Sequence, residues 1–306
     1  MALSVPIING TKRRHRIVAG RIKDTSAVHS RLPHAVLRAA LVILLVATPS
    51  LLLPLGGAES APIVFLIAIS AAFFTVIEYS AASPSIIEFR DAPPFNRLRF
   101  AALGVTIVTL SLIMRGDIVP TTLTQLLALV GHQVGATMDF PFSPVRLMLL
   151  MMPQGTSVEV MTDIRMAAGI AYLLSLLSIV AFVLLLRTKR WPHRSETFNV
   201  WTNLPMFDPT AGADVVKRLN RDSQVNLILG FLLPFMIPAI IKTMTLISGP
   251  INLNDPQTLI WMVTAWAFLP SGLLMRGVAL SRVAQMIHYQ RKQAYARAMA
   301  GGLQPA

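Results

Sequence analysis

Residues 35–55 read AVLRAALVILLVATPSLLLPL, and residues 62–79 read PIVFLIAISAAFFTVIEY. Each stretch holds about 20 mostly apolar residues, the length that an α-helix needs to cross the hydrocarbon core of a bilayer. The link between them, Gly56–Ala61, is very short. The two stretches therefore predict an antiparallel hairpin of membrane-spanning helices.

Four more apolar stretches follow, at 100–114, 166–186, 225–247 and 259–278. The first is short for a span, but Arg97, Arg99 and Arg115 flank it with long side chains that reach the interfaces. The composition agrees with a membrane protein, because 54% of the residues are hydrophobic and 13% are charged, whereas a soluble domain has about 25% charged residues. We predict an all-α polytopic membrane helix bundle with six transmembrane helices.

The basic residues predict the orientation of the bundle. Lys and Arg number 27 against 14 acidic residues, and 23 of the 27 fall in four alternate segments. These segments are 1–38, 78–99, 187–222 and 276–306. Because cytoplasmic loops carry the excess of Lys and Arg, both chain ends are predicted to be cytoplasmic. The charge then faces an anionic inner leaflet in four separate places, which argues against nucleic acid as a partner.

The orientation divides the chain into a basic cytoplasmic tail (1–34), a six-span membrane domain (35–278) and a basic amphipathic cytoplasmic tail (279–306). We predict a bacterial cytoplasmic (inner) membrane as its location. An Arg-rich transit peptide for an organelle is the alternative explanation of the first tail. A cleaved secretory signal is not expected, because no short apolar run with a small-residue cleavage site follows closely.

The outside segment 115–165 is long and apolar. Residues 121–135 carry one apolar stripe at helical spacing, formed by Leu123, Leu126, Leu127, Val130 and Val134. Ser143 and Pro144 are typical of a helix start and predict a short helix over 145–152. We expect a pair of interfacial amphipathic helices on the outer leaflet. A re-entrant pore-lining element, a cap and a partner-binding platform are the alternatives.

The cytoplasmic loop 81–100 combines aromatic and charged residues. One interpretation is a solvated turn whose arginines extend to the interface. The other is a loop that docks onto a protein partner through side chains that include Phe89, Arg90, Phe95 and Arg97. Both interpretations agree with Pro93–Pro94, which prevents a continuous helix.

A few polar or helix-breaking residues lie within the predicted spans and are candidate functional or structural residues. Pro234 and Pro238 are four residues apart in the fifth span and predict a broken helix, as in the binding sites of some transporters. Asn226 lies in the first turn of that span. Glu78 and Arg276 lie at the cytoplasmic ends of spans two and six, where they have the depth to form an interhelical pair.

The sequence argues against several chemistries. It contains no cysteine, and it has no HExxH, GxSxG, Walker A or GxGxxG pattern. No histidine lies within a span, so no catalytic residue, cofactor or metal ligand is predicted. We expect a non-catalytic integral membrane subunit, scaffold or assembly factor of a larger inner-membrane complex, with membrane proteins as its partners. The alternative is a small-solute channel or transporter built around the fifth span.

Overall fold

The computed structural model describes residues 10–53, 61–188, 191, 198–208, 212, 214–249 and 253–300. This part of the chain is helical and contains no strand. The helices are α1 (Gly10–Leu52), α2 (Ala61–Ser80), α3 (Phe95–Gly116), α4 (Thr122–Met138), α5 (Pro144–Leu150), α6 (Val158–Thr188), α7 (Val200–Asn203), α8 (Val215–Ser248) and α9 (Pro256–Ala300). The predicted link Gly56–Ala61, except its last residue, and the first nine residues lie outside the described part.

Six helices are long and apolar enough to cross a membrane, which confirms the predicted number of candidate spans. The stretches are Arg31–Leu52, Pro62–Ser80, Phe95–Gly116, Val158–Thr188, Val215–Thr245 and Pro256–Ala300. The third span is longer than predicted, because α3 begins at Phe95, directly after Pro94, and has 22 residues. Arg97 and Arg99 are therefore part of the helix and do not precede it.

The boundaries predicted at 34/35 and 278/279 do not interrupt a helix. α1 is 43 residues long and α9 is 45 residues long, and each runs through its boundary. Residues 279–300 are rich in Ala, Arg, Gln and Met, which are strong helix formers, so the helix continues after the apolar stretch ends.

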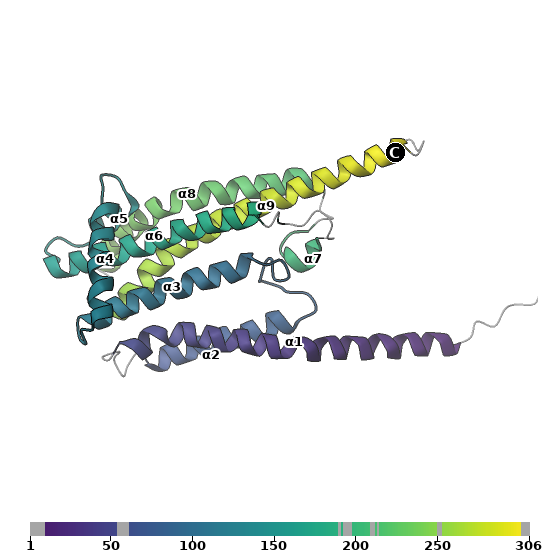
Figure 1. Ribbon diagram of the computed structural model, residues 1–306, viewed down its shortest axis with the longest axis horizontal. Helices are drawn as coiled ribbons and strands as arrows, with labels where there is room; N and C mark the ends of the chain where they lie inside the picture. Colours follow the sequence, from purple (N-terminus) through teal and green to yellow (C-terminus); the bar gives the residue numbers. More distant parts are fainter. Residues whose placement is uncertain are drawn as a thin grey trace, which may run out of the picture.

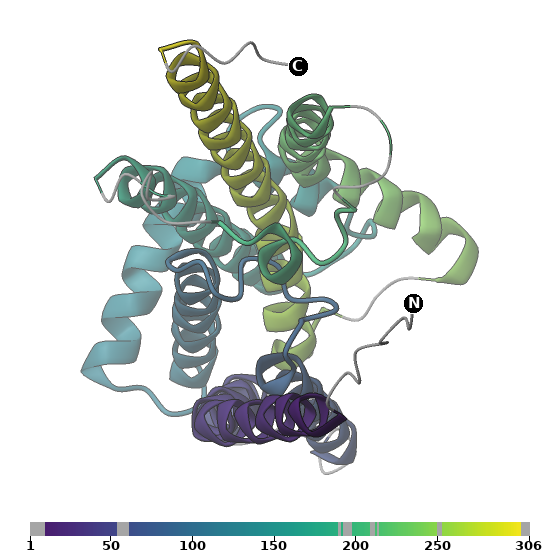
Figure 2. The ribbon, with the colours of Figure 1, turned by 90° about the vertical axis from the view of Figure 1, so that its right-hand side faces the viewer.

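The long helices lie side by side along one axis (Figure 1). α7 and the end of α9 lie at one end of the bundle, which we call the α7 end. α5 lies at the opposite end, the α4 end, where α4 lies across the ends of the long helices. Figure 2, viewed from the α7 end, shows the α1–α2 hairpin on one side of α3 and α9.

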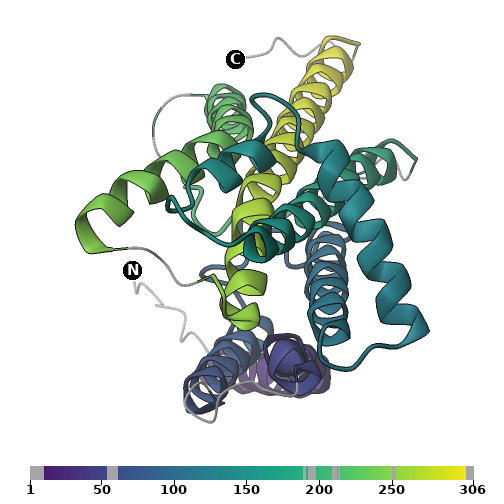
Figure 3. The ribbon, with the colours of Figure 1, turned by 90° about the vertical axis from the view of Figure 1, so that its left-hand side faces the viewer.

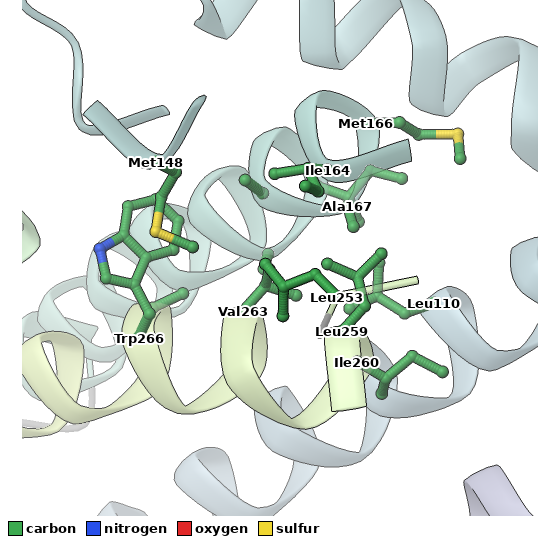
Figure 4. Packing of buried hydrophobic residues seen from close by; sticks show 14 of the residues in the cluster. Leu110, Met148, Ile164, Met166, Ala167, Leu253, Leu259, Ile260, Val263 and Trp266 are labelled. Atoms are coloured by element: carbon green, nitrogen blue, oxygen red, sulfur yellow. The ribbon is translucent and has the colours of Figure 1, made fainter. Parts of the chain in front are cut away.

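Two apolar cores hold the bundle together, one at each end. The core at the α4 end joins α3, α5, α6 and α9 around residues such as Leu110, Met148 and Val263 (Figure 4). The core at the α7 end is more aromatic, and it includes Phe89, Phe182 and Trp191. Side chains from loops complete the second core, so the loops at this end are part of the packed structure.

Small residues allow the closest helix contacts. A methyl group at Gly169 of α6 would lie 2.6 Å from the Cα of Gly135 of α4, so these backbones touch. α8 and α9 cross in the same way, because a methyl group at Gly277 would lie 2.9 Å from the Ser223 carbonyl oxygen. The Ser223 hydroxyl donates a 2.7 Å hydrogen bond to the Gly277 carbonyl at this crossing.

The two helices predicted in 115–165 are present as α4 and α5, and the Ser143 hydroxyl accepts a 3.0 Å hydrogen bond from the Arg146 N–H as expected of a cap. Most of the predicted apolar stripe lies on the exposed face of α4. Leu123, Leu126 and Val130 are exposed, whereas Gly131 and Gly135 are buried. The face of α4 that packs on α6 carries small residues because the two backbones approach closely there.

Candidate functional site

Glu78, at the end of α2, organises the loop that follows. Its carboxylate accepts hydrogen bonds from the backbone N–H groups of Ser85, Ile86 and Ile87, at 3.0 to 3.2 Å. The Arg90 guanidinium donates from the other side to the carbonyls of Glu78 and Ala81, at 2.8 and 2.7 Å. These bonds fix the conformation of the loop, while Ser83, Ser85 and Ile86 remain exposed.

Arg276 pairs with Glu88 of this loop. Its Nε and Nη2 atoms lie 2.6 and 2.7 Å from the two carboxylate oxygens of Glu88, a bidentate ion pair that joins α9 to the loop. The interhelical pair of Arg276 with Glu78 is not present, because the Glu78 carboxylate is occupied by backbone N–H groups. Both residues contact the same loop, but a similar position along two spans does not specify a partner.

Three of the four predicted docking residues are buried inside the chain. Phe89 and Phe95 are each 1% exposed, and their rings lie 4.6 Å apart in the aromatic core. Arg90 is 8% exposed and is held by carbonyls, as described above. These side chains therefore stabilise the fold and are not available as surface anchors, whereas Arg97 is exposed.

Arg97 lines a cleft of about 1000 Å³ between the α1–α2 hairpin and the rest of the bundle. The loop 81–94 contributes Ile86, Ile87 and Glu88 to its wall. The remaining lining residues come mainly from α1, α2, α3, α8 and α9: His34, Leu37, Arg38, Leu41, Val42, Thr75, Tyr79, Asn96, Arg97, Arg99, Phe100, Leu103, Met206, Asn226, Phe268, Leu273 and Arg276. We call this cavity the hairpin cleft.

The hairpin cleft forms because α1 is attached to the bundle by its far half. At the α4 end, Arg115 of α3 donates a 2.8 Å hydrogen bond to the Leu52 carbonyl, and Gln257 of α9 donates a 2.9 Å bond to the Ser50 hydroxyl. Farther along, Gly104 of α3 lies against Leu45. Toward the α7 end, the helices separate and the loop 81–94 closes the gap.

The charged lining of the hairpin cleft is mostly basic. Arg38 lies over the ring of Tyr79, 4.2 Å from its centroid. The Arg99 guanidinium lies 5.2 and 5.4 Å from the ring centroids of Phe95 and Phe268, and its buried Nε has no hydrogen-bond partner among the described residues. Asn226 is also buried at the lining, and its amide donates a 2.6 Å bond to the Asp222 carbonyl of its own helix.

α8 is not broken at Pro234 and Pro238, contrary to the prediction, and both residues lie within one helix from Val215 to Ser248. Its second half turns outward in the view from the α4 end (Figure 3), as expected of a proline bend, and remains in contact with α5. Pro238 has no N–H to offer the Pro234 carbonyl. The indole Nε1 of Trp266 donates to that carbonyl instead, at 3.0 Å, so the freed acceptor is satisfied by a neighbouring helix.

Arg38 and Arg99 are not among the site residues predicted from the sequence. Arg38 interrupts an apolar stretch seven residues after Arg31, and Arg99 precedes the third predicted span. The signal that could have indicated a site was the presence of arginines at similar positions in two spans. The sequence gives no indication that α1 and α3 are neighbours. The cleft depends on that contact.

No group of three or more His, Cys, Asp or Glu side chains within the described residues is arranged to hold a metal ion. The hairpin cleft presents basic and apolar side chains. Comparison of the chain with protein families, with curated proteins and with solved structures found no match.

Proposed function

We propose that this chain is a non-catalytic integral membrane subunit, a scaffold or an assembly factor of a larger inner-membrane complex. The α1–α2 hairpin carries the proposal. α2 contacts α1 and no other described helix. Its most apolar 18 residues are 17% buried, as are those of α8, compared with 56% for α9. Its free side is apolar and aromatic, with Phe65, Phe73 and Phe74 exposed, as expected of a span that packs against a transmembrane helix of another protein.

The roles of the intramembrane polar residues support a structural function. Glu78 holds a loop, Arg276 holds the same loop to α9, and Trp266 compensates the proline bend in α8. These groups stabilise the chain and are occupied by partners within it. The continuous α8 speaks against the alternative, a solute channel or transporter built around a broken fifth span.

The proposed orientation has both chain ends in the cytoplasm. In its support, α7 and the end of α9 lie at the same end of the bundle (Figure 1), as do the loop 81–94 and the arginines of the hairpin cleft. α4 and α5 then face the outer leaflet. α4 lies across the bundle axis with Leu126 and Leu129 exposed, which is the geometry of an interfacial helix.

The test is purification of the tagged protein from its native membrane in mild detergent, followed by mass spectrometry of the proteins that accompany it. We expect a defined set of membrane proteins in fixed ratio. Purification as a single protein or as a homo-oligomer would contradict the proposal.

Matched variants connect this test to the hairpin. Phe65→Ala together with Phe73→Ala removes large exposed side chains from α2, and we expect the partners to be lost. Leu177→Ala together with Leu184→Ala makes a comparable change on the exposed face of α6, and we expect the partners to be retained. Equal retention by both double variants would exclude α2 as the contact.

A further inference from the structure

The lining of the hairpin cleft has a basic part and an apolar part. We propose that the cleft binds one anionic phospholipid, with its phosphate among Arg38, Arg97 and Arg99 and its acyl chains along the apolar residues of α1 and α3. This inference is independent of the scaffold proposal, because it requires no protein partner.

The charge of the lining requires an anion. Four arginines and one glutamate line the cleft. Glu88 is engaged at both carboxylate oxygens by Arg276, and no carboxylate of the described residues forms an ion pair with Arg38, Arg97 or Arg99. Basic pockets between transmembrane helices favour anionic head groups, and guanidinium groups match the geometry of phosphate oxygens.

Arg99 is positioned by aromatic rings at the wall of the cleft. Its guanidinium lies between the rings of Phe95 and Phe268, and its Nη2 would be 3.1 Å from a methyl group at Gly272. Gly272 thus leaves room for the guanidinium against α9. A fixed arginine with a buried, unpartnered Nε is prepared to donate to an acceptor that the chain itself does not provide.

On α1 and α3, apolar residues line the cleft one helical turn deeper than the arginines. On α1, Leu41 and Val42 follow Arg38 by three and four residues, and on α3, Leu103 follows Arg99 by four. Leu37 and Phe100 line the cleft beside these arginines. The basic groups therefore have apolar walls on their deeper side, as the head group and acyl chains of a phospholipid require.

The size of the cleft favours a lipid over a free anion as its ligand. A volume of about 1000 Å³ is at the upper limit of ligand pockets, which span about 300–1,000 Å³. A lone phosphate would leave the apolar walls without contacts. The acyl chains of a phospholipid cover these walls and extend through the open side of the cleft into the bilayer.

The experiment measures lipid retention by native mass spectrometry on the detergent-purified full chain. The probes are phosphatidylglycerol and phosphatidylcholine with identical acyl chains. We expect one phosphatidylglycerol to be retained in preference to phosphatidylcholine. Because each basic side chain contributes about fivefold to the binding of an anionic lipid, Arg97→Gln with Arg99→Gln should weaken phosphatidylglycerol binding by roughly 25-fold. Arg187→Gln removes an exposed charge at the same end, outside the cleft, and should leave binding unchanged.

A second pair of variants tests the acyl site without changing charge. Leu41→Trp places a larger side chain in the cleft and should block retention of the lipid. Leu44→Trp makes the same substitution on α1 outside the lining and should not. Both proteins should show the same far-ultraviolet circular dichroism as the parent, because neither change removes a contact from the two apolar cores.

Three results would overturn the proposal. Equal retention of the two lipids would show that the arginines do not select an anion. Unchanged phosphatidylglycerol binding in the double arginine variant or in Leu41→Trp would place the lipid elsewhere. Displacement of phosphatidylglycerol by inorganic phosphate at equal concentration would show that the cleft recognises a soluble anion instead of a lipid.

Discussion

The hydrogen bond from Trp266 to Pro234 offers a direct test of how the bundle tolerates a proline bend. The bond is 3.0 Å long and buried, with Trp266 only 2% exposed. Trp266→Phe removes the donor and leaves the Pro234 carbonyl unsatisfied, which costs about 1–3 kcal/mol of unfolding free energy, apart from the packing lost with the indole. Pro238→Ala restores the backbone N–H that a helix without proline donates to the carbonyl four residues earlier, here that of Pro234.

The two changes should therefore be coupled in a double-mutant cycle. In the Pro238→Ala background the carbonyl keeps a donor, so Trp266→Phe should cost about 1 kcal/mol less than in the parent. The assay is reversible unfolding by SDS in mixed micelles, followed by far-ultraviolet circular dichroism. Trp261→Phe serves as the control and should show no coupling to Pro238→Ala. Additivity of the two changes within about 0.3 kcal/mol would refute the compensation by Trp266.

Three further predictions concern other contacts of the fold. Gly135→Ala places a methyl group 2.9 Å from backbone atoms of α6 and should destabilise the chain by about 1–3 kcal/mol in the same unfolding assay, whereas Gly104→Ala, 3.7 Å from a side chain, should be nearly neutral. Glu88→Gln breaks a partly buried bidentate ion pair and should cost about 2 kcal/mol; a cost below about 0.5 kcal/mol would show that the pair is dispensable. A hydrogen bond from Arg291 in the tail of α9 lowers the pKa of Asp214 from its ordinary value of 3.8. The contact between Asp214 and Arg291 should therefore persist at neutral pH and be lost as acidification protonates the carboxylate. A fluorescence distance between labels on α8 and on the tail should report this loss, and Asp214→Asn should show the open distance at every pH.

Apolar stretches and residue spacing were enough to predict the spans and the helices α4 and α5. A span is encoded locally, by about 20 consecutive apolar residues. The short helix α5 was also predictable, because Ser143 and Pro144 are adjacent in the chain and act on the turn that follows. These features need no information about which helices are neighbours.

The candidate site depended on partners that are distant in sequence. Glu88 and Arg276 are 188 residues apart, and the charge pattern of the loop gave no reason to prefer this pair over Glu78 with Arg276. Phe89 was equally ambiguous, because an aromatic residue in a charged loop packs either on a partner or on the chain itself. Tertiary packing against Phe95 and Trp191 decided in favour of the chain itself.

The length of α9 sets how far the protein reaches from the bundle. Residues 288–300 continue the helix without a buried side chain, and thirteen helical residues extend about 20 Å. Pro270 is the last proline in α9, so the projecting segment and Arg276 at the hairpin cleft lie on the same proline-free length of helix. A molecule that binds the tip near Ala300 therefore acts on the helix that carries Arg276 and crosses α8 at Gly277.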